Sequence, residues 1–171
     1  RLGDSLHVSA DDDGPALTLP ALPGLSALAL TPPERRPAWT YLTWLRDQLG
    51  LVRDISELEQ LAQEVPDSAG VHLVPAFGGL GLPHWCPQAR AAITGLSSHS
   101  DRRHVARAAF ESIGFQLGDA LEAMGSEAGV AIMTLHGDGG PTASAFLMQR
   151  CADLTGVELR VARDPHLSPL G

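Results

Sequence analysis

The stretch that decides the fold runs from residue 130 to residue 161 and reads VAIMTLHGDGGPTASAFLMQRCADLTGVELRV. It begins with an apolar run to residue 135, typical of a buried strand, and continues into a glycine-rich turn at residues 136–140. A helix is predicted over residues 142–155 with Gly156 as its C-terminal cap, and the alternating residues 157–161 predict a second strand. Strand, glycine turn, helix and strand in this order form an α/β unit.

The strongest helical pattern in the chain precedes this unit, over residues 101–124. Apolar side chains recur there at three- and four-residue spacing, at Val105, Ala109, Ile113, Leu117, Leu121 and Met124. Ser100 is the predicted N-cap, and the carboxylate of Asp101 favours the positive end of the helix.

Two shorter helices are predicted before it. Pro37 can open the first helix, and Gly50 ends it. The second begins at a capping box, in which the Ser56 hydroxyl takes a backbone N–H and Glu59 reaches back, and it ends near Glu64.

The remaining segments predict short strands and loops. Residues 71–75 and 91–96 read as strands on either side of a loop rich in glycine and proline. Residues 1–36 form the least regular region, with a candidate strand at residues 5–9 and a turn at residues 11–15.

Composition excludes several classes of protein. A net charge of -8 and a pI of about 5.2 argue against a nucleic-acid-binding surface, which needs clustered cations. No apolar run approaches the roughly 20 residues that a membrane span requires. The two cysteines, Cys86 and Cys151, form no CxxC pair, so we expect both to be reduced in a cytoplasmic protein. Because the chain starts at Arg1 and stops at Gly171 without a closing element, we expect both ends to be cuts through a longer polypeptide.

The glycine turn has two interpretations. Gly139 and Gly140 follow a strand and lead directly into a helix, which gives close backbone approach and N–H groups aimed at a ligand, as a nucleotide site requires. Taken alone, the pair is better explained as a plain strand-to-helix turn. Asp138 could order the water shell of a metal ion or simply cap the turn, and the sequence leaves both open.

A second polar cluster precedes the long helix. His99, Asp101 and His104 are metal-ligand types, but their spacing is not a zinc pattern and Asp101 serves the helix start. We therefore predict no metal ligands in this chain.

Four stretches resemble the FGGY family of carbohydrate kinases. Residues 91–111 fit the second signature of that family at every constrained position, from Gly95-Leu96 through to the block that ends at Glu111. Residues 74–85, VPAFGGLGLPHW, resemble the loop of glycerol kinases within the family, and residues 44–47, WLRD, resemble a family helix. Asp138-Gly139-Gly140 followed by FLMQ at residues 146–149 resembles the family's adenosine motif.

This resemblance implies an α/β domain of the actin/hexokinase-like (ribonuclease H-like) type, with a mixed sheet flanked by helices. Residues 37–171 would be the C-terminal, nucleotide-binding domain with its last helix missing, and residues 1–36 a divergent strand and loop region of the same domain. The implied cofactors are ATP and Mg²⁺. The implied partners are an N-terminal substrate-binding domain of the same kinase, which supplies a catalytic aspartate, and a sugar or polyol; a homodimer is left open.

The resemblance also assigns site residues. It implies that Gly140 contacts the nucleotide and that Ser144 occupies a position near the adenine, where relatives carry Asn or Ser. Thr43 stands where relatives carry a nucleotide-holding Gln, and Trp39 stands where they carry the preceding Gly. Asp4 aligns with a threonine that touches the phosphates in relatives.

These departures leave two main hypotheses for function, beside a purely structural fragment that would bind no nucleotide. The first is the ATP-binding half of a carbohydrate or polyol kinase. The alternative is a non-catalytic relative that keeps the fold as a nucleotide-sensing or interaction module, which Asp4 and Trp39 favour because a carboxylate near a phosphate is repulsive and an indole fills space.

Overall fold

A computed structural model describes residues 40–137 and 140–161 of the chain. The predicted strand at residues 5–9 and the turn at residues 11–15 lie outside the described residues. So do four residues singled out in the sequence, Asp4, Trp39, Asp138 and Gly139.

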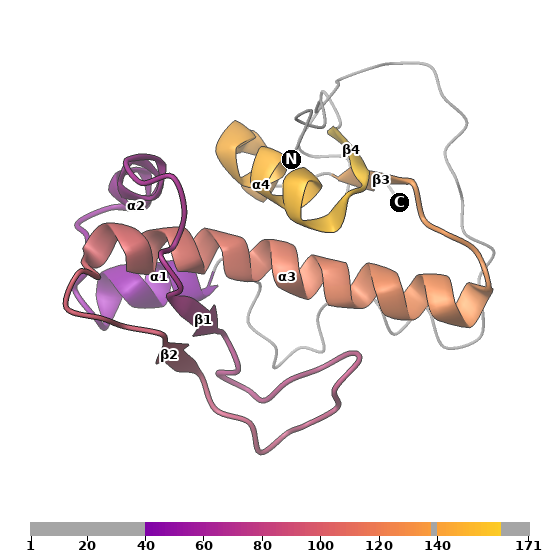
Figure 1. The fold of residues 1–171 in the computed structure, drawn as a ribbon, viewed down its shortest axis with the longest axis horizontal. Helices are drawn as coiled ribbons and strands as arrows, with labels where there is room; N and C mark the ends of the chain where they lie inside the picture. The colour runs from indigo at the N-terminus through magenta and orange to yellow at the C-terminus, as the bar shows by residue number, and fades with distance from the viewer. Residues whose placement is uncertain (1–39, 138–139, 162–171) are drawn as a thin grey trace.

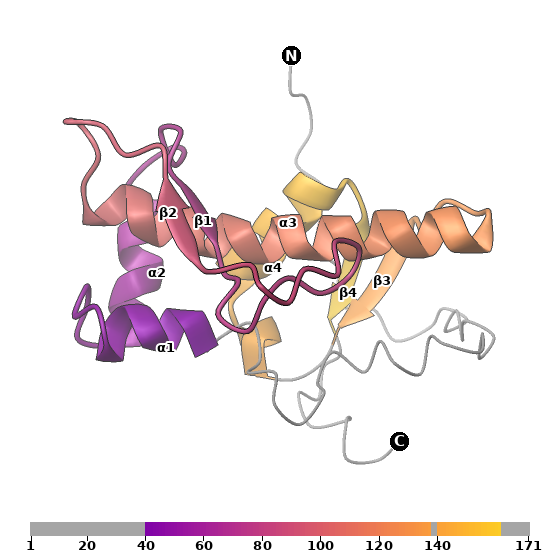
Figure 2. The ribbon, with the colours of Figure 1, turned by 90° about the horizontal axis from the view of Figure 1, so that it is seen from below.

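One long helix, α3 (Arg102–Ala128), runs through the middle of the molecule. In Figure 1 the helices α2 (Ile55–Gln63) and α4 (Ala145–Thr155) lie along one side of it, and both pack on it. The short strands β1 (His72–Val74) and β2 (Ala92–Thr94) lie along the other side. Helix α1 (Thr40–Asp47) lies with α2 near the start of α3, as Figure 2 shows.

The start of α3 differs by one residue from the prediction. Asp101 is the N-cap: its carboxylate accepts a hydrogen bond from the backbone N–H of Arg103, and its own N–H donates to Nδ1 of His104 in a capping box. The Ser100 prediction is wrong, because the Ser100 hydroxyl accepts from the N–H of Ser97 instead. A single carboxylate with extended backbone thus begins the helix.

The start of α2 also differs from the prediction. Asp54, not Ser56, is the N-cap, and its carboxylate accepts from the N–H of Glu57 at 2.8 Å. Glu57 accepts a hydrogen bond from the N–H of Arg53, the residue before the cap, and the predicted box between Ser56 and Glu59 does not form. Ser56 donates its hydroxyl to Asp54 at 2.6 Å and therefore supports the cap without being it.

The predicted α/β unit is confirmed between residues 134 and 161. Strand β3 (Thr134–Gly137) pairs in parallel with β4 (Glu158–Val161), and the connection between them runs through a short 3₁₀ turn, η2 (Gly140–Ala143), and α4. Gly156 ends α4 in the left-handed conformation, with φ of +69°, as the sequence predicts. The first strand begins later than predicted, because Val130 and Met133 are exposed and only Thr134 onward joins the ladder.

The strands of the described residues form two small sheets. β1 and β2 pair antiparallel, with Leu73 opposite Ile93, and β3 and β4 form the parallel pair. The apolar core lies between α3 and its neighbours and includes Leu45, Leu58, Val71, Phe110, Leu147 and Cys151.

Cys151 is part of that core and not a reactive thiol. It is buried and free, and burial raises the pKa of its thiol to about 11. The thiol therefore stays protonated at neutral pH and fills space like a small apolar side chain.

Within residues 40–137 and 140–161, no helix combines the length and the apolar character needed to cross a bilayer.

Candidate functional site

The end of β3 and the start of α4 bring two predicted site residues together. Gly140 opens the 3₁₀ turn that follows the strand, and Ser144 is the N-cap of α4. The Ser144 hydroxyl accepts a hydrogen bond from the N–H of Leu147 at 3.0 Å. The segment thus presents a glycine and a polar hydroxyl at the N-terminal end of a helix, where the first backbone N–H groups have no partner within the helix and suit an anion or a polar ligand.

A residue from α2 completes this segment. The Ser144 hydroxyl donates to Oε2 of Glu59 at 2.9 Å, across 85 residues of sequence. The other carboxylate oxygen of Glu59 accepts from Nε2 of Gln63 at 3.2 Å. Both Glu59 and Ser144 remain partly exposed, so ligands can reach them.

Aromatic and ionic contacts hold the start of α4 against α3. The rings of Phe146 and Phe110 meet edge to face, with centroids 5.3 Å apart. The guanidinium of Arg107 lies over the Phe146 ring, 5.5 Å from its centroid. The position of Ser144, two residues earlier, is therefore fixed by the core and not by the loop alone.

Arg107 forms a buried ion pair with Glu111, one turn further along α3. Its Nε lies 2.6 Å from Oε1 of Glu111, and the two side chains are only 7% and 12% exposed. Its Nη1 donates to the carbonyl oxygens of Ala62, in the last turn of α2, and of Val65, just after that helix. One side chain thereby joins α2, α3 and α4.

Thr43, a third predicted site residue, lies partly buried on a separate element, α1. Its neighbours Tyr41 and Trp44 both contact the ring of Phe77 in the following loop, with centroid distances of 6.4 and 5.0 Å. The other predicted residues, Asp4, Asp138 and Gly139, lie outside the described residues.

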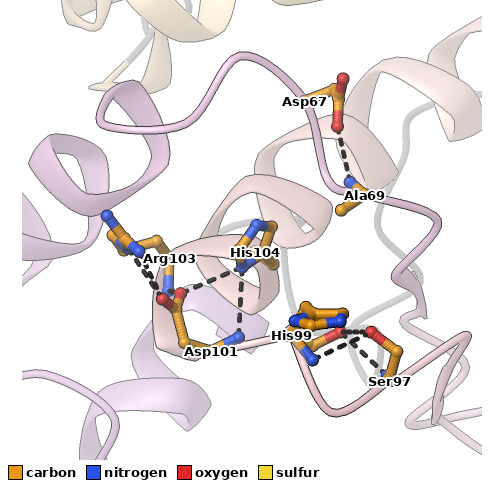
Figure 3. A network of polar contacts seen from close by, with 8 residues as sticks. Asp67, Ala69, Ser97, His99, Asp101, Arg103 and His104 are labelled. Carbon is orange, nitrogen blue, oxygen red and sulfur yellow. Dashed lines mark hydrogen bonds and ion pairs between the residues drawn. The ribbon is translucent and has the colours of Figure 1, made fainter.

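The polar side chains before α3 form their hydrogen bonds and ion pairs with one another and with the nearby backbone (Figure 3). The Asp101 carboxylate pairs with the Arg103 side chain at 2.6 Å, and the guanidinium holds the pKa of that carboxyl far below its usual range. The N–H of His99 donates to the Ser97 hydroxyl. In the part of the chain that the structure describes, no group of three His, Cys, Asp or Glu residues could hold a metal ion.

The glycine-rich loop between β1 and β2 closes on itself. Gly79 has φ of +88°, and a Cβ at this position would lie 2.7 Å from Cα of Pro87. Leu80 and Cys86 exchange backbone hydrogen bonds across the loop at 2.9 and 3.0 Å. This glycine is required by the close approach of the loop's own backbone.

Sequence reasoning missed Glu59 and Arg107. Glu59 was assigned to a capping box that it does not form, and no local pattern signals its contact with Ser144. Arg107 and Glu111 have the i, i+4 spacing of a helical ion pair, which was a usable signal, but their burial is not visible in the sequence.

Comparison with known proteins gives this geometry a family. The model of the "FGGY family of carbohydrate kinases, C-terminal domain" matches residues 38–171. The glycerol kinase of Shewanella amazonensis is 52% identical over 118 residues, which cover 69% of this chain and 24% of that protein. The glycerol kinase of Alkalilimnicola ehrlichii is 46% identical over 134 residues, 78% of this chain and 27% of that protein. The chain thus spans about a quarter of the length of these curated relatives.

Solved structures agree with the sequence comparison. The structure of Plasmodium falciparum glycerol kinase with ADP superposes with a TM-score of 0.73 at 32% identity, over 78% of this chain and 26% of that one. A ligand-bound xylulose kinase from Lactobacillus acidophilus superposes with a TM-score of 0.65 at 25% identity, over 74% of this chain and 26% of that one. The predicted α/β class and actin/hexokinase-like fold are confirmed. The chain belongs to the FGGY family of carbohydrate kinases and corresponds to the C-terminal domain of that family.

Proposed function

We propose that this chain is the ATP-binding half of a carbohydrate or polyol kinase. The observation that carries the proposal is the segment from Gly140 to Ser144, which joins a parallel strand to a helix N-terminus in a chain of this family. In α/β sheets, ligands bind beyond the carboxyl ends of the strands, where this segment lies. In a kinase of this family, the ligand expected at this place is a nucleotide.

The described residues fit a nucleoside better than a triphosphate. Ser144 and Glu59 offer uncharged and anionic oxygens, which suit the donors of a base or ribose and not a phosphate. The backbone N–H groups at the start of α4 are the phosphate-compatible feature. Phosphoryl transfer depends on positioning and charge neutralisation, so Mg²⁺ bound to the phosphates would supply the positive charge when the nucleotide is present. Asp138 is the candidate to order the water shell of that ion.

The remaining chemistry belongs to a partner domain in this proposal. An N-terminal substrate-binding domain would provide the sugar or polyol site and the aspartate that accepts the hydroxyl proton. Glycerol is the first substrate to assay, because relatives 46–52% identical to this chain are named glycerol kinases. In such an assay, the 171-residue chain by itself would bind nucleotide but would not phosphorylate glycerol, xylulose or gluconate.

Titration calorimetry with ADP and the 171-residue chain tests the nucleotide site. We expect ADP to bind, and Gly140→Val to abolish binding while circular dichroism stays unchanged, because a β-branched side chain would fill the space that the nucleotide needs. Gly78→Val is the matched control: a Cβ at Gly78 meets no heavy atom within 4 Å, so this variant should bind ADP like the original chain.

Two results would contradict the proposal. If Gly140→Val retains full ADP affinity with an unchanged spectrum, the nucleotide does not approach residue 140. If the original chain binds no ADP and a form joined to an N-terminal domain also binds none, the chain is not a nucleotide-binding domain.

A non-catalytic module is the second candidate, and the residues that the family resemblance compares at positions 4 and 39 favour it. Thr43 stands where relatives carry Gln, and Asp4 and Trp39 replace two further family residues. In this case nucleotide binding would persist, but a chain joined to a complete N-terminal domain would show no phosphorylation of glycerol, xylulose or gluconate. A coupled kinase assay on the joined protein separates the two candidates.

A further inference from the structure

A groove runs along the second half of α3, apart from the segment at residues 140–144 that carries the proposed nucleotide site. Its volume is about 620 Å³, and its walls are α3 from Gly114 to Ser126, residues 130–132 and the end of α4. In Figure 1 this half of the helix extends beyond α1, α2, β1 and β2. We propose that the groove is a docking site for an amphipathic helix of a partner protein, with apolar side chains on one face and lysine or arginine beside them.

The apolar side chains that line the groove stay largely in water. Phe115, Val130 and Leu154 are 48%, 57% and 38% exposed, and all three belong to its lining. Apolar surface that gathers in one place and remains exposed marks an interaction site, and aromatic side chains are enriched at such sites. The groove thus offers a partner apolar area to bury and one aromatic ring to pack against.

One glycine in the groove has no explanation within the chain. A Cβ at Gly114 would lie 2.7 Å from Cδ1 of Leu154, and a Cβ at Gly125 would lie 3.0 Å from a backbone carbonyl oxygen, so close packing requires both glycines. A Cβ at Gly118 would meet only Cγ2 of Thr155, at an ordinary 3.9 Å. Glycine weakens a helix interior, so the fold alone favours a larger residue here. Close approach of a partner to the backbone at Gly118 accounts for it.

The rim of the groove is acidic. Asp119 and Glu122 both line it and lie three residues apart on α3, so they share one face of the helix. Nε2 of His84 lies 3.2 Å from Oδ2 of Asp119, with both side chains about half exposed. Glu122 is exposed, and no arginine stands among the described residues that line the groove. The rim therefore attracts a cationic partner and repels an anionic one.

Charge argues against the two occupants that this chain could supply itself. In a two-fold dimer, Asp119 and Glu122 of one copy would face the same pair of the other, and each copy has a net charge of -8. Residues 1–39 carry five carboxylates and only three arginines, so this segment is acidic as well. A separate, cationic partner is the occupant that the rim selects.

The dimensions of the groove suit a helix. The α3 residues in its lining recur at three- and four-residue spacing between Gly114 and Ser126, so the groove follows the helix axis. Twelve steps along a helix cover about 18 Å, or slightly more than three turns. An amphipathic helix of similar length can lay side chains at i, i+3, i+4 and i+7 into a groove of this kind.

Fluorescence anisotropy with two labelled synthetic peptides tests the proposal on the 171-residue chain. The first peptide, of about 14 residues, has leucine at i, i+3, i+4 and i+7 spacing and lysine elsewhere, and its twin has glutamate in place of each lysine. An ionic strength of about 0.15 M limits electrostatic reach to about 8 Å, so the net charge of the chain alone does not hold the peptide. We expect the lysine peptide to bind at least about tenfold more tightly than its twin.

Glu122→Lys should invert this preference, with the lysine peptide about tenfold weaker and the glutamate peptide tighter. Glu64→Lys is the matched control, because it makes the same change on the exposed C-cap residue of α2, outside the groove lining. Its preference should equal that of the original chain.

Gly118→Leu fills the groove without changing its charge and should weaken the lysine peptide about tenfold. Circular dichroism establishes that each variant keeps its fold. If Gly118→Leu does not, the comparison of Glu122→Lys with Glu64→Lys decides, because both of these residues are exposed.

Four results would overturn the docking site and leave the nucleotide proposal standing. Equal losses in Glu122→Lys and Glu64→Lys would show attraction to overall charge only. Unchanged peptide binding by folded Gly118→Leu would show that the peptide lies elsewhere. Failure of the original chain to bind either peptide would show that the groove takes no such helix. A dimer in sedimentation velocity that Gly118→Leu converts to a monomer would make a second copy of this chain the occupant.

Discussion

The two halves of α3 differ in how closely they pack against the rest of the molecule. In the first half, residues 106–110 are all buried, and Arg107 joins three helices through its ion pair, its carbonyl contacts and the Phe146 ring. In the second half, Leu121 is the only buried residue of α3 after Gly114. Phe115 is 48% exposed there, and a groove of about 620 Å³ opens between the helix, residues 130–132 and the end of α4.

Small residues characterise the second half. Gly114, Gly118 and Gly125 face this groove, and Leu154 at the end of α4 stays 38% exposed beside it. The helix is therefore anchored by large side chains at its start and is only lightly packed further along. Exposed backbone and low packing make a region easier to open locally.

The candidate site lies on the anchored side. Glu59 belongs to α2, and Ser144 begins α4 just before Phe146, so both residues are held by the first half of α3. A polar site that positions a ligand needs fixed geometry, and the firmly packed half supplies it. The comparison predicts that substitutions in the first half of α3 strongly lower the free energy of unfolding, whereas substitutions in the second half lower it little or even raise it.

The largest expected effect comes from Arg107. Arg107→Met leaves Glu111 buried without its partner and removes the donor from the carbonyl oxygens of Ala62 and Val65. Breaking a buried ion pair on one side costs about 3–5 kcal/mol of unfolding free energy. Urea denaturation followed by circular dichroism measures this change.

The paired control for Arg107 removes both charges. Arg107→Met with Glu111→Leu should recover most of the loss, because no charge is then left unpaired, but not all of it, because the two carbonyl oxygens still lack a donor. A loss below about 1 kcal/mol for Arg107→Met alone would show that Arg107 is not the anchor of this half.

Tyr41 tests the boundary between the two halves. Its buried hydroxyl donates to Oε1 of Gln116, in the middle of α3, at 3.1 Å. Tyr41→Phe should cost about 0.5–1 kcal/mol at neutral pH, a small loss because the exposed Gln116 amide regains water.

Alkaline pH should remove the stabilising contribution of Tyr41. Burial raises the pKa of Tyr41 above its ordinary value of about 10, so the unfolded chain loses the proton first. The stabilisation is complete below that value and is lost as pH rises through the higher pKa of the folded state. Tyr41 is the only tyrosine, so tyrosinate absorbance reports this group alone. A transition near pH 10 in the folded chain would contradict its burial.

The sequence predicted those elements whose signals are local. Apolar spacing predicts the α/β unit at residues 134–161 and the long helix, and Gly156 predicts the end of α4. Each of these signals lies within a few residues of the element that it predicts. The start of α2 was predicted two residues late, and the start of α3 one residue early. At both places a serine and an aspartate lie close together in the sequence, and either side chain could be the N-cap. At Asp54 and at Asp101 the carboxylate became the cap.

The contacts that define the site could not be predicted in the same way. Glu59 and Ser144 meet across 85 residues, and only the packing of α2 and α4 on α3 brings them together. Arg107 shows the same limit in another form, because arginine is almost always exposed and its helical spacing to Glu111 gives no sign of burial. Local patterns thus identified the elements, whereas the chemistry of the candidate site arose from their assembly.

The smallest expected effect, and the one with the opposite sign, is at Gly118 in the lightly packed half. A glycine inside a helix costs about 0.5–1 kcal/mol relative to alanine, because its backbone loses more freedom on folding. A Cβ at Gly118 would meet only Cγ2 of Thr155, at an ordinary contact distance of 3.9 Å. Gly118→Ala should therefore stabilise the chain by about 0.5–1 kcal/mol in a urea melt.

Gly114, one turn earlier, is the matched control, because it faces the same groove at its crowded end. A Cβ there would lie 2.7 Å from Cδ1 and 3.4 Å from Cβ of Leu154, so that side chain must move and the gain in helix propensity is offset. If Gly114→Ala stabilises as much as Gly118→Ala, Leu154 yields without cost and the packing between α3 and α4 is looser than its distances indicate. If Gly118→Ala destabilises instead, something covers the groove beside Thr155 in solution, and the contrast between the two halves of α3 fails at the residue where it should be easiest to see.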